Sequence, residues 1–290
     1  MASLRGHPSP PFREAVLQAE IELRGKQARS FQFEDGSRDP ARALVCIAGM
    51  GANGRSFARQ RPLAADRFVL MLNTPAATPA AADPIAFAAD AVEDFLDSER
   101  LERPVLIGSS FGGAVAALVA IRRAARLGGL LLVSPVLARS QIPLAFPGFL
   151  DFIGAPAPVA RFLAPLAVQV MGGFSLDRDG RDEIVRESRN FEGRELKRRL
   201  QALLALDLIP ALRASPVRIE WIHGSRDLLV PVGRARRAAA AVQAERFVLV
   251  PGAGHLPYLS HPLIFNAAVS TFLARLAQGP ADERAAAAPP

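Results

Sequence analysis

Six short runs of mostly apolar residues constrain the fold of this chain more than any other feature of its sequence. Each run is four to six residues long, and most lack the alternation of polar and apolar positions that a half-exposed strand shows. Strands that helices cover on both sides of a sheet are apolar on both faces. The pattern therefore predicts a buried, largely parallel sheet. The runs lie at 43–48, 68–72, 104–107, 130–133, 217–222 and 247–250.

Stretches with helical periodicity separate most of these runs. In 262–276, for example, one face of a helix is followed by Leu263, Ala267, Ser270 and Leu273 or Phe272. Strands that alternate with helices in this way are typical of a doubly wound α/β sheet. The expected helices lie at 54–65, 84–97, 111–127, 233–241 and 262–276.

A clearer alternation of polar and apolar residues precedes the first of the six runs. Segments 19–23 and 28–33 both alternate and lie on either side of Gly25. This arrangement predicts an antiparallel hairpin. We therefore expect an α/β fold with a mostly parallel, doubly wound sheet and an antiparallel edge near the N-terminus.

The alternation of strands and helices stops between 137 and 207, where prolines interrupt helix-like pieces and no strand run occurs. We expect a helical insertion there, either as extra packing helices or as a cap over a site. The predicted organisation is a disordered segment 1–12, a core in two parts at 13–136 and 208–278, the insertion 137–207, and a disordered tail 279–290. A cap would carry an apolar face of Phe146, Phe149, Leu150, Phe152, Phe162, Leu163 and Leu166.

The charge pattern argues against a nucleic-acid-binding protein. The net charge of +7 comes from 35 basic and 28 acidic residues, but the arginine pairs lie in separate helical segments and form no single stripe. The lone cysteine, Cys46, lies in an apolar run and suits a reducing compartment. The N-terminus lacks the pattern of a signal peptide, and no apolar stretch reaches the ~20 residues of a membrane span. We expect a cytoplasmic protein without a membrane span.

One strand run leads directly into a serine flanked by glycines. Residues 106–115 read LIGSSFGGAV, so that Gly108-x-Ser110-x-Gly112 joins the run at 104–107 to a helix. A serine on such a sharp turn projects above the sheet, and the glycines leave room for the close approach of neighbouring backbone. The pattern identifies Ser110 as a candidate nucleophile.

A serine nucleophile needs a base and an orienting carboxylate. His255 stands in the glycine-rich loop after the last strand run, and Asp227 stands in the loop after the preceding run. We expect them to act as base and acid, although Asp227 could instead cap the next helix. The remaining histidines, His7, His223 and His261, are expected to be structural.

Two backbone amides are candidates to stabilise a developing oxyanion. Phe111 begins the helix after Ser110, and Met50 lies in the glycine-rich loop that follows the run at 43–48. This loop could alternatively cradle a phosphate, but it lacks the lysine and the glycine spacing of phosphate-binding loops. An oxyanion hole formed by Met50 and Phe111 is therefore expected.

Together these motifs resemble the α/β-hydrolase fold superfamily over nearly the whole chain, in its branch of small serine hydrolases and esterases with an inserted helical cap. The shared marks are the serine turn, the pattern H-G-x-x-D-x-x-V-P at 223–231 and G-x-G-H at 252–255. Two features depart from the family pattern. Ala48-Gly49 replaces the usual His-Gly, and 73–78 replaces the usual Asp-x-x-Gly-x-Gly loop.

The resemblance implies a serine hydrolase that cleaves the carboxylic ester of a hydrophobic small molecule through an acyl-enzyme, with Val230 and Leu256 contacting the substrate. No cofactor or metal is expected. The same catalytic residues also occur in thioesterases, lactonases, C–C bond hydrolases, aminopeptidases and acyltransferases, and some proteins of this fold act as ligand sensors. A serine at position 110 argues against dehalogenase or epoxide hydrolase chemistry, which uses an aspartate there.

Overall fold

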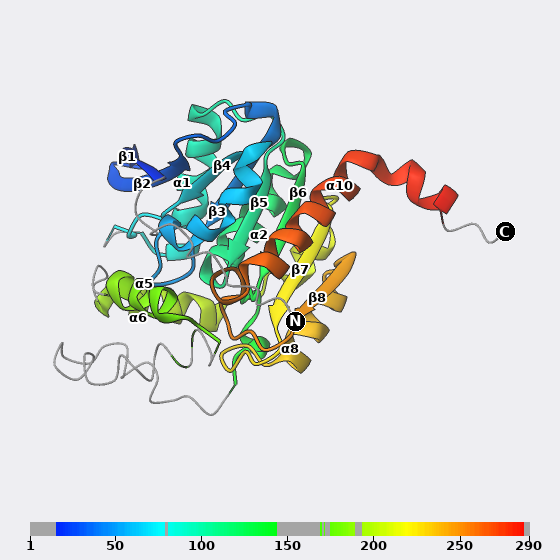
Figure 1. Cartoon of the computed structure of the whole chain (residues 1–290). Coiled ribbons are helices and arrows are strands. Elements are labelled where there is room, and N and C mark those ends of the chain that lie inside the picture. The colour runs from blue at the N-terminus through cyan, green and yellow to red at the C-terminus, as the bar shows by residue number, and fades with distance from the viewer. Residues whose placement is uncertain are drawn as a thin grey trace, which may run out of the picture.

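An eight-stranded sheet forms the centre of the molecule (Figure 1). The computed structural model describes residues 16–78, 81–143, 169, 171, 175–188 and 193–286. Across the sheet, the strands lie in the order β1 (Val16–Leu23), β2 (Lys26–Phe33), β4 (Phe68–Leu72), β3 (Ala43–Ile47), β5 (Val105–Ser109), β6 (Gly129–Val133), β7 (Ile219–Gly224) and β8 (Arg246–Val250).

The sheet is parallel from β4 to β8 and antiparallel at one edge, where β2 pairs with both β1 and β4. All six predicted runs and the N-terminal hairpin form strands, so the predicted fold class is confirmed. β3 illustrates why its sequence does not alternate. Val45 and Ile47 pack into the core on one face, Leu44 and Cys46 pack into the core on the other, and all four are fully buried.

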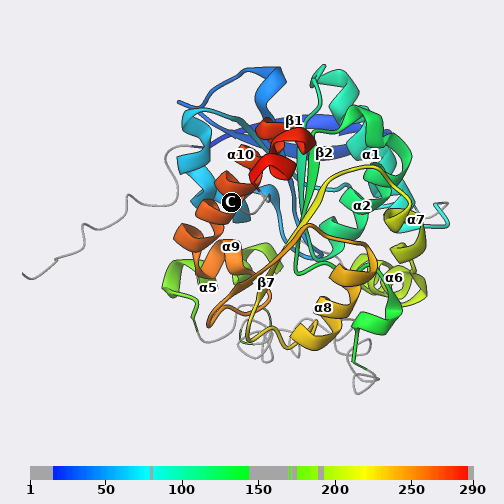
Figure 2. The same ribbon diagram turned by 90° about the vertical axis from the view of Figure 1, so that its right-hand side faces the viewer.

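Helices cover both faces of the sheet (Figure 2). A large apolar core joins one face to α1 (Pro84–Ser98), α2 (Phe111–Arg123), α7 (Ile209–Arg213) and α8 (Val232–Ala241). A second core joins the other face to η2 (Gly54–Ala65), α9 (Pro257–Ser260) and α10 (Pro262–Ala286). The remaining described helices are η1 (Pro40–Arg42), η3 (Ala124–Arg126), η4 (Arg139–Gln141), α5 (Arg178–Ser188) and α6 (Gly193–Ala205).

Two helices differ from the sequence expectation. η2 is a 3₁₀ helix and not an α-helix; it contains Pro62, which has no N–H for the α-helical hydrogen-bond pattern. α10 continues to Ala286, into the range 279–290 where a disordered tail is expected. That range is rich in alanine, which favours helix more than any other residue. No helix in the described ranges is long and apolar enough to cross a membrane.

The two ends of the predicted insertion lie side by side. Ala138 and Asp207 form an isolated antiparallel bridge. Beside it, the Leu208 N–H donates to the Leu137 carbonyl at 2.8 Å, and the Arg139 N–H donates to the Leu206 carbonyl at 3.0 Å. The chain thus leaves the core and returns to it at neighbouring points. Segment 1–12 and the seven residues of the predicted apolar cap face lie outside the described residues.

Candidate active site

Ser110 lies on the sharp turn between β5 and α2. Its φ of 53° and ψ of −116° are strained for a residue with a side chain, at a cost on the order of 1–3 kcal/mol. The turn is held by hydrogen bonds from the Ser110 N–H to the Val133 carbonyl at 3.0 Å and from the Gly113 N–H to the Ser110 carbonyl at 2.9 Å. Such strain is typical of catalytic positions.

The glycines around Ser110 allow α2 to approach the sheet closely. A Cβ at Gly112 would collide with the carbonyl oxygens of Ile47 and Ala48 at the end of β3. A Cβ at Gly108 would lie only 2.5 Å from the Gly112 carbonyl oxygen. The spacing of these glycines therefore follows from packing against β3 and from the turn itself.

Asp227 and His255 are brought together from the loops after β7 and β8. The His255 Nδ1 lies 2.8 Å from the Asp227 Oδ2, and both side chains are buried. The other carboxylate oxygen accepts hydrogen bonds from the N–H groups of Leu229 and Val230, each at 2.9 Å. If Nδ1 donates to the carboxylate, Nε2 carries the lone pair of a base.

The two loops are packed tightly around this pair. A Cβ at Gly224, where β7 ends, would collide with the carbonyl of Gly254, the residue before His255. The insertion also reaches the histidine loop, because the His255 N–H donates to the Met171 carbonyl at 2.9 Å. These contacts fix the imidazole relative to Asp227.

Sequence reasoning missed the part that His223 plays beside this pair. Its Nε2 lies 2.8 Å from the Val230 carbonyl and 3.3 Å from the Asp227 Oδ2, and its Nδ1 accepts from the Trp221 indole at 3.4 Å. These partners fit a neutral ring with its proton on Nε2. The spacing H-G-x-x-D was the available signal, because it places His223 near the end of β7 and Asp227 only four residues later, in the loop that follows.

The buried site shifts two pKa values. Burial alone would raise the pKa of Asp227, but the charge and hydrogen bond of His255, together with the charge of His223 and the Val230 N–H, hold it below its ordinary value. Burial also lowers the pKa of His223, although the Asp227 carboxylate opposes that change. At neutral pH the site therefore holds an ionised Asp227 and a neutral His223.

Unfolding is expected to become easier as the pH falls below 6.5, the ordinary pKa of histidine. The folded-state pKa of His223 is depressed, so the unfolded chain binds a proton there that the folded chain does not. The contribution of His223 to the free energy of unfolding is fully present above pH 6.5 and is lost as the pH falls toward the folded-state pKa. The free energy of unfolding then falls by at most about 1.4 kcal/mol per pH unit. Asp227 acts with the same sign at lower pH.

Urea unfolding of the parent and of His223→Gln at about pH 8 and about pH 5.5 measures this slope. Glutamine can still donate to the Val230 carbonyl but does not titrate. The stability of the variant should fall less between the two pH values. An equal fall in both proteins would contradict the assignment to His223.

The structure places the other predicted site residues at the same edge of the sheet. A Cβ at Gly49 would lie 3.3 Å from the Ser110 Cβ, so the loop that contains Met50 runs beside the serine. Phe111 is the first residue of α2. Val230 and Leu256 are both buried. Val230 lies three residues after Asp227 in the chain, and its N–H and carbonyl bind Asp227 and His223. Leu256 directly follows His255.

The His255 Nε2 is buried and makes no hydrogen bond within the described residues, so it does not engage the Ser110 hydroxyl in this structure. Ser110, Asp227 and His255 follow the carboxyl ends of β5, β7 and β8, and the carboxyl ends of parallel strands lie at one edge of a sheet. Catalytic hydrogen bonds are often longer without substrate. The arrangement can therefore supply a nucleophile, a base and an acid to one substrate.

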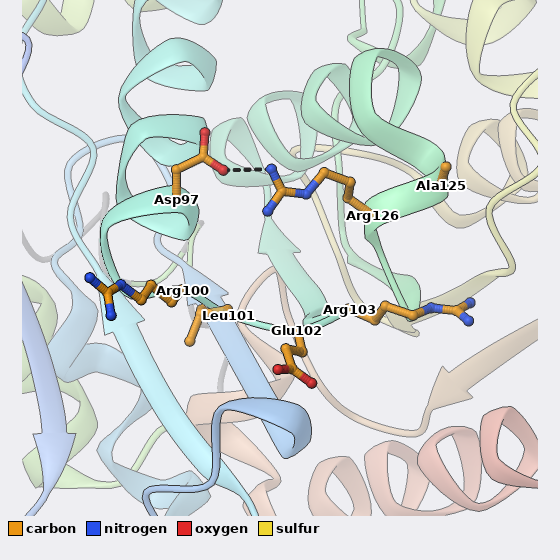
Figure 3. Close-up of a pocket in the computed structure, with 7 residues that line it drawn as sticks. All are labelled: Asp97, Arg100, Leu101, Glu102, Arg103, Ala125 and Arg126. Atoms are coloured by element: carbon orange, nitrogen blue, oxygen red, sulfur yellow. Dashed lines mark hydrogen bonds and ion pairs between the residues drawn. The ribbon is translucent and has the colours of Figure 1, made fainter.

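A hollow of about 440 Å³ lies at the opposite edge of the sheet (Figure 3). Asp97, Arg100 and Arg103 line it, and Arg126 donates to Asp97 there at 2.8 Å. It adjoins the start of β5, whereas Ser110 follows the end of that strand. Ligands of doubly wound sheets bind at the carboxyl ends of the strands, so this hollow is separate from the candidate active site. Within the described ranges, no group of three or more His, Cys, Asp or Glu side chains is placed to hold a metal.

Comparisons with known proteins agree with this fold. Residues 44–268 match the Alpha/beta hydrolase family. The chain is 30% identical over 258 residues to the pimeloyl-(acyl-carrier protein) methyl ester esterase of Edwardsiella ictaluri, and the match covers 82% of this chain and 93% of that protein.

Solved structures with lower identity share the fold alone. An esterase from Exiguobacterium antarcticum has a TM-score of 0.74 at 16% identity and covers 88% of this chain and 98% of its own. A bromoperoxidase from Bacillus anthracis also has a TM-score of 0.74, at 17% identity, and covers 89% of this chain and 100% of its own. The family match over most of the chain confirms the resemblance seen in the sequence: the chain belongs to the Alpha/beta hydrolase family and is a hydrolase.

Proposed function

We propose that the protein is a serine hydrolase that cleaves the carboxylic ester of a small molecule with a hydrophobic group, through an acyl-enzyme. The observation that carries this proposal is the 2.8 Å contact between the His255 Nδ1 and the buried Asp227 carboxylate. It leaves the His255 Nε2 as a base at the sheet edge where Ser110 lies on its strained turn. The match to a relative named as a methyl ester esterase also favours ester hydrolysis.

In the first half of the proposed reaction, the Ser110 hydroxyl attacks the ester carbonyl while the His255 Nε2 takes its proton. Asp227 stabilises the imidazolium. The N–H groups of Met50 and Phe111 donate to the oxyanion of the tetrahedral intermediate. When this intermediate collapses, the alcohol leaves with the proton from His255, and the acyl group stays on Ser110.

In the second half, water attacks the carbonyl of the acyl-enzyme while His255 removes a proton from that water. Collapse of the second intermediate releases the carboxylic acid and returns the proton to Ser110. The same residues could act on thioesters, lactones or C–C bonds, or transfer the acyl group to another acceptor. We favour esters because the matched relative is named as an esterase.

Labelling with a fluorophosphonate probe tests the nucleophile and its base. The parent is expected to label at one site, which peptide mass spectrometry should locate at Ser110. His255→Ala should label at least about 100-fold more slowly, because general-base assistance contributes about 10²–10⁴-fold. Labelling at a residue other than Ser110, or an unchanged rate in His255→Ala, would contradict the mechanism.

Hydrolysis of nitrophenyl esters with increasing acyl chain length tests the substrate class. If the site buries an apolar acyl chain, kcat/KM should rise from acetate to longer chains, because each buried CH₂ contributes about 0.8 kcal/mol to binding. A clear preference for acetate over every longer chain would exclude the hydrophobic acyl group. A single slow turnover with ligand-dependent binding of a second protein would instead favour a sensor.

A further inference from the structure

Helix α6 of the insertion carries a buried ion pair beside the candidate active site. The Arg199 Nε donates to the Glu195 Oε1 at 2.9 Å, and only 1% of Arg199 and 7% of Glu195 is exposed. Burial lowers the pKa of Arg199, while Glu195 acts in the opposite direction; an arginine nevertheless stays charged in proteins. Removing two charges from water is costly unless their other hydrogen-bonding groups also find partners.

Those partners lie in the loop after β4. Arg199 donates to the Thr74 hydroxyl at 3.0 Å, to the Thr74 carbonyl at 3.3 Å and to the Pro75 carbonyl at 2.8 Å. Glu195 accepts from the Ala77 N–H at 3.2 Å. The ion pair therefore joins the insertion to the loop 73–78, which departs from the family pattern.

The same guanidinium lies over the aromatic ring of Phe111, with its Cζ 4.8 Å from the ring centre. A cation over an aromatic ring at this distance is attracted to it. Phe111 is fully buried and directly follows Ser110. From the same helix, Leu196 reaches the loop that contains Met50, because its Cδ2 lies 3.6 Å from where a Cβ of Gly51 would be. Helix α6 thus touches both segments that carry the proposed oxyanion donors.

We propose that Arg199 is a positioning residue for the reaction, a role that rests on the proposed function. Its guanidinium, fixed by the loop 73–78, packs on the Phe111 ring and thereby keeps the Phe111 N–H directed at the oxyanion. A planar fork with several N–H groups can bind Glu195, Thr74 and Pro75 while its central carbon lies over the Phe111 ring. Arg199 does not itself touch the reacting atoms.

The neighbouring Arg198 provides a matched control. It donates to the carbonyls of Ala77 and Thr78 at 3.3 Å and of Ala81 at 2.7 Å, and it lies 3.6 Å from Glu195. It therefore anchors the same helix to the same loop, but the cation over Phe111 belongs to Arg199. If anchoring were the whole role of Arg199, the two arginines would be equivalent for catalysis.

The test measures kcat and KM for a nitrophenyl ester, and the rate of fluorophosphonate labelling, in Arg199→Met and Arg198→Met. Removing one oxyanion donor lowers kcat by about 10²–10³-fold, and displacing it should lower kcat less. We therefore expect Arg199→Met to lower kcat about tenfold. KM should change much less. Arg198→Met should lower the melting temperature but leave kcat within about twofold. Equal effects of the two substitutions on kcat would overturn the proposal.

A double-mutant cycle with Phe111→Leu separates positioning from general loosening. If Arg199 acts through the Phe111 ring, Arg199→Met should lower kcat much less in the Phe111→Leu background than in the parent. Additive effects on kcat would refute the role. Arg199→Lys keeps the charge without the fork, and an intermediate loss of kcat in that variant supports the proposal if Arg199→Met does not fold. An unchanged kcat in Arg199→Lys would then overturn it.

The outcomes also distinguish this proposal from the proposed function. If the parent labels at Ser110 and hydrolyses esters while Arg199→Met does both at the parent rate, only the positioning role fails. If the parent neither labels nor hydrolyses any ester, the proposed function fails, whatever the variants do.

Discussion

Ser110→Ala is expected to lower kcat/KM for ester hydrolysis by about 10⁵–10⁶-fold. Alanine has no hydroxyl to form the acyl-enzyme, and the Asp227–His255 pair cannot supply another nucleophile at the same position. The residual rate should come from the oxyanion donors and from substrate binding. Because alanine keeps a Cβ on the strained turn, the variant should fold as the parent does.

Ser109→Ala is the matched control for this experiment. It removes the same hydroxyl one residue earlier, at the end of β5, where the Ser109 side chain is fully buried. We expect Ser109→Ala to change the melting temperature and to leave kcat/KM near the parent value. If Ser110→Ala retained more than about one hundredth of the parent activity, serine catalysis at this site would be excluded.

Asp227→Asn is expected to lower kcat by about 10⁴-fold. Asp227 uses one oxygen to accept from the Leu229 and Val230 N–H groups, and the other to accept from His255. In asparagine, the single carbonyl oxygen must stay on the two backbone N–H groups, which leaves its NH₂ facing His255. That NH₂ can only donate, so it selects the imidazole tautomer with its proton on Nε2, which cannot deprotonate Ser110.

Steady-state kinetics of Asp227→Asn and of Asp207→Asn measure this effect. Asp207 also accepts from a backbone N–H two residues further on, that of Ile209, at 3.1 Å. The same chemical change is therefore made in a similar local turn outside the site. Asp207→Asn should leave kcat unchanged within about twofold, since asparagine caps as well as aspartate does. Equal kinetics for the two variants would show that Asp227 does not orient His255.

The strands and the contact between Asp227 and His255 could be predicted from the sequence because local rules determine them. A strand covered on both faces must be apolar throughout, as Leu44, Val45, Cys46 and Ile47 are. The pairing of Asp227 with His255 follows from their positions after neighbouring parallel strands, because those positions lie at one edge of the sheet.

The roles of Arg199 and His223 could not be predicted in this way. The sequence presents Arg199 as half of an arginine pair in a charged helix, a pattern typical of an exposed face. Its burial depends on Thr74, which is 125 residues away in the chain. His223 appears as a polar residue at a strand end, and although its spacing from Asp227 hints at a contact, the turn after β7 brings the ring to 3.3 Å from the Asp227 carboxylate.

The antiparallel bridge between Ala138 and Asp207 has a consequence for how such a protein can diversify. Because this bridge joins the two points where the chain leaves and rejoins the core, the segment between them can lengthen, shorten or be exchanged while β6 and β7 keep their pairing. New substrate selectivity could then arise from changes in the inserted segment alone. The strand-end loops that carry Ser110, Asp227 and His255 would keep their places.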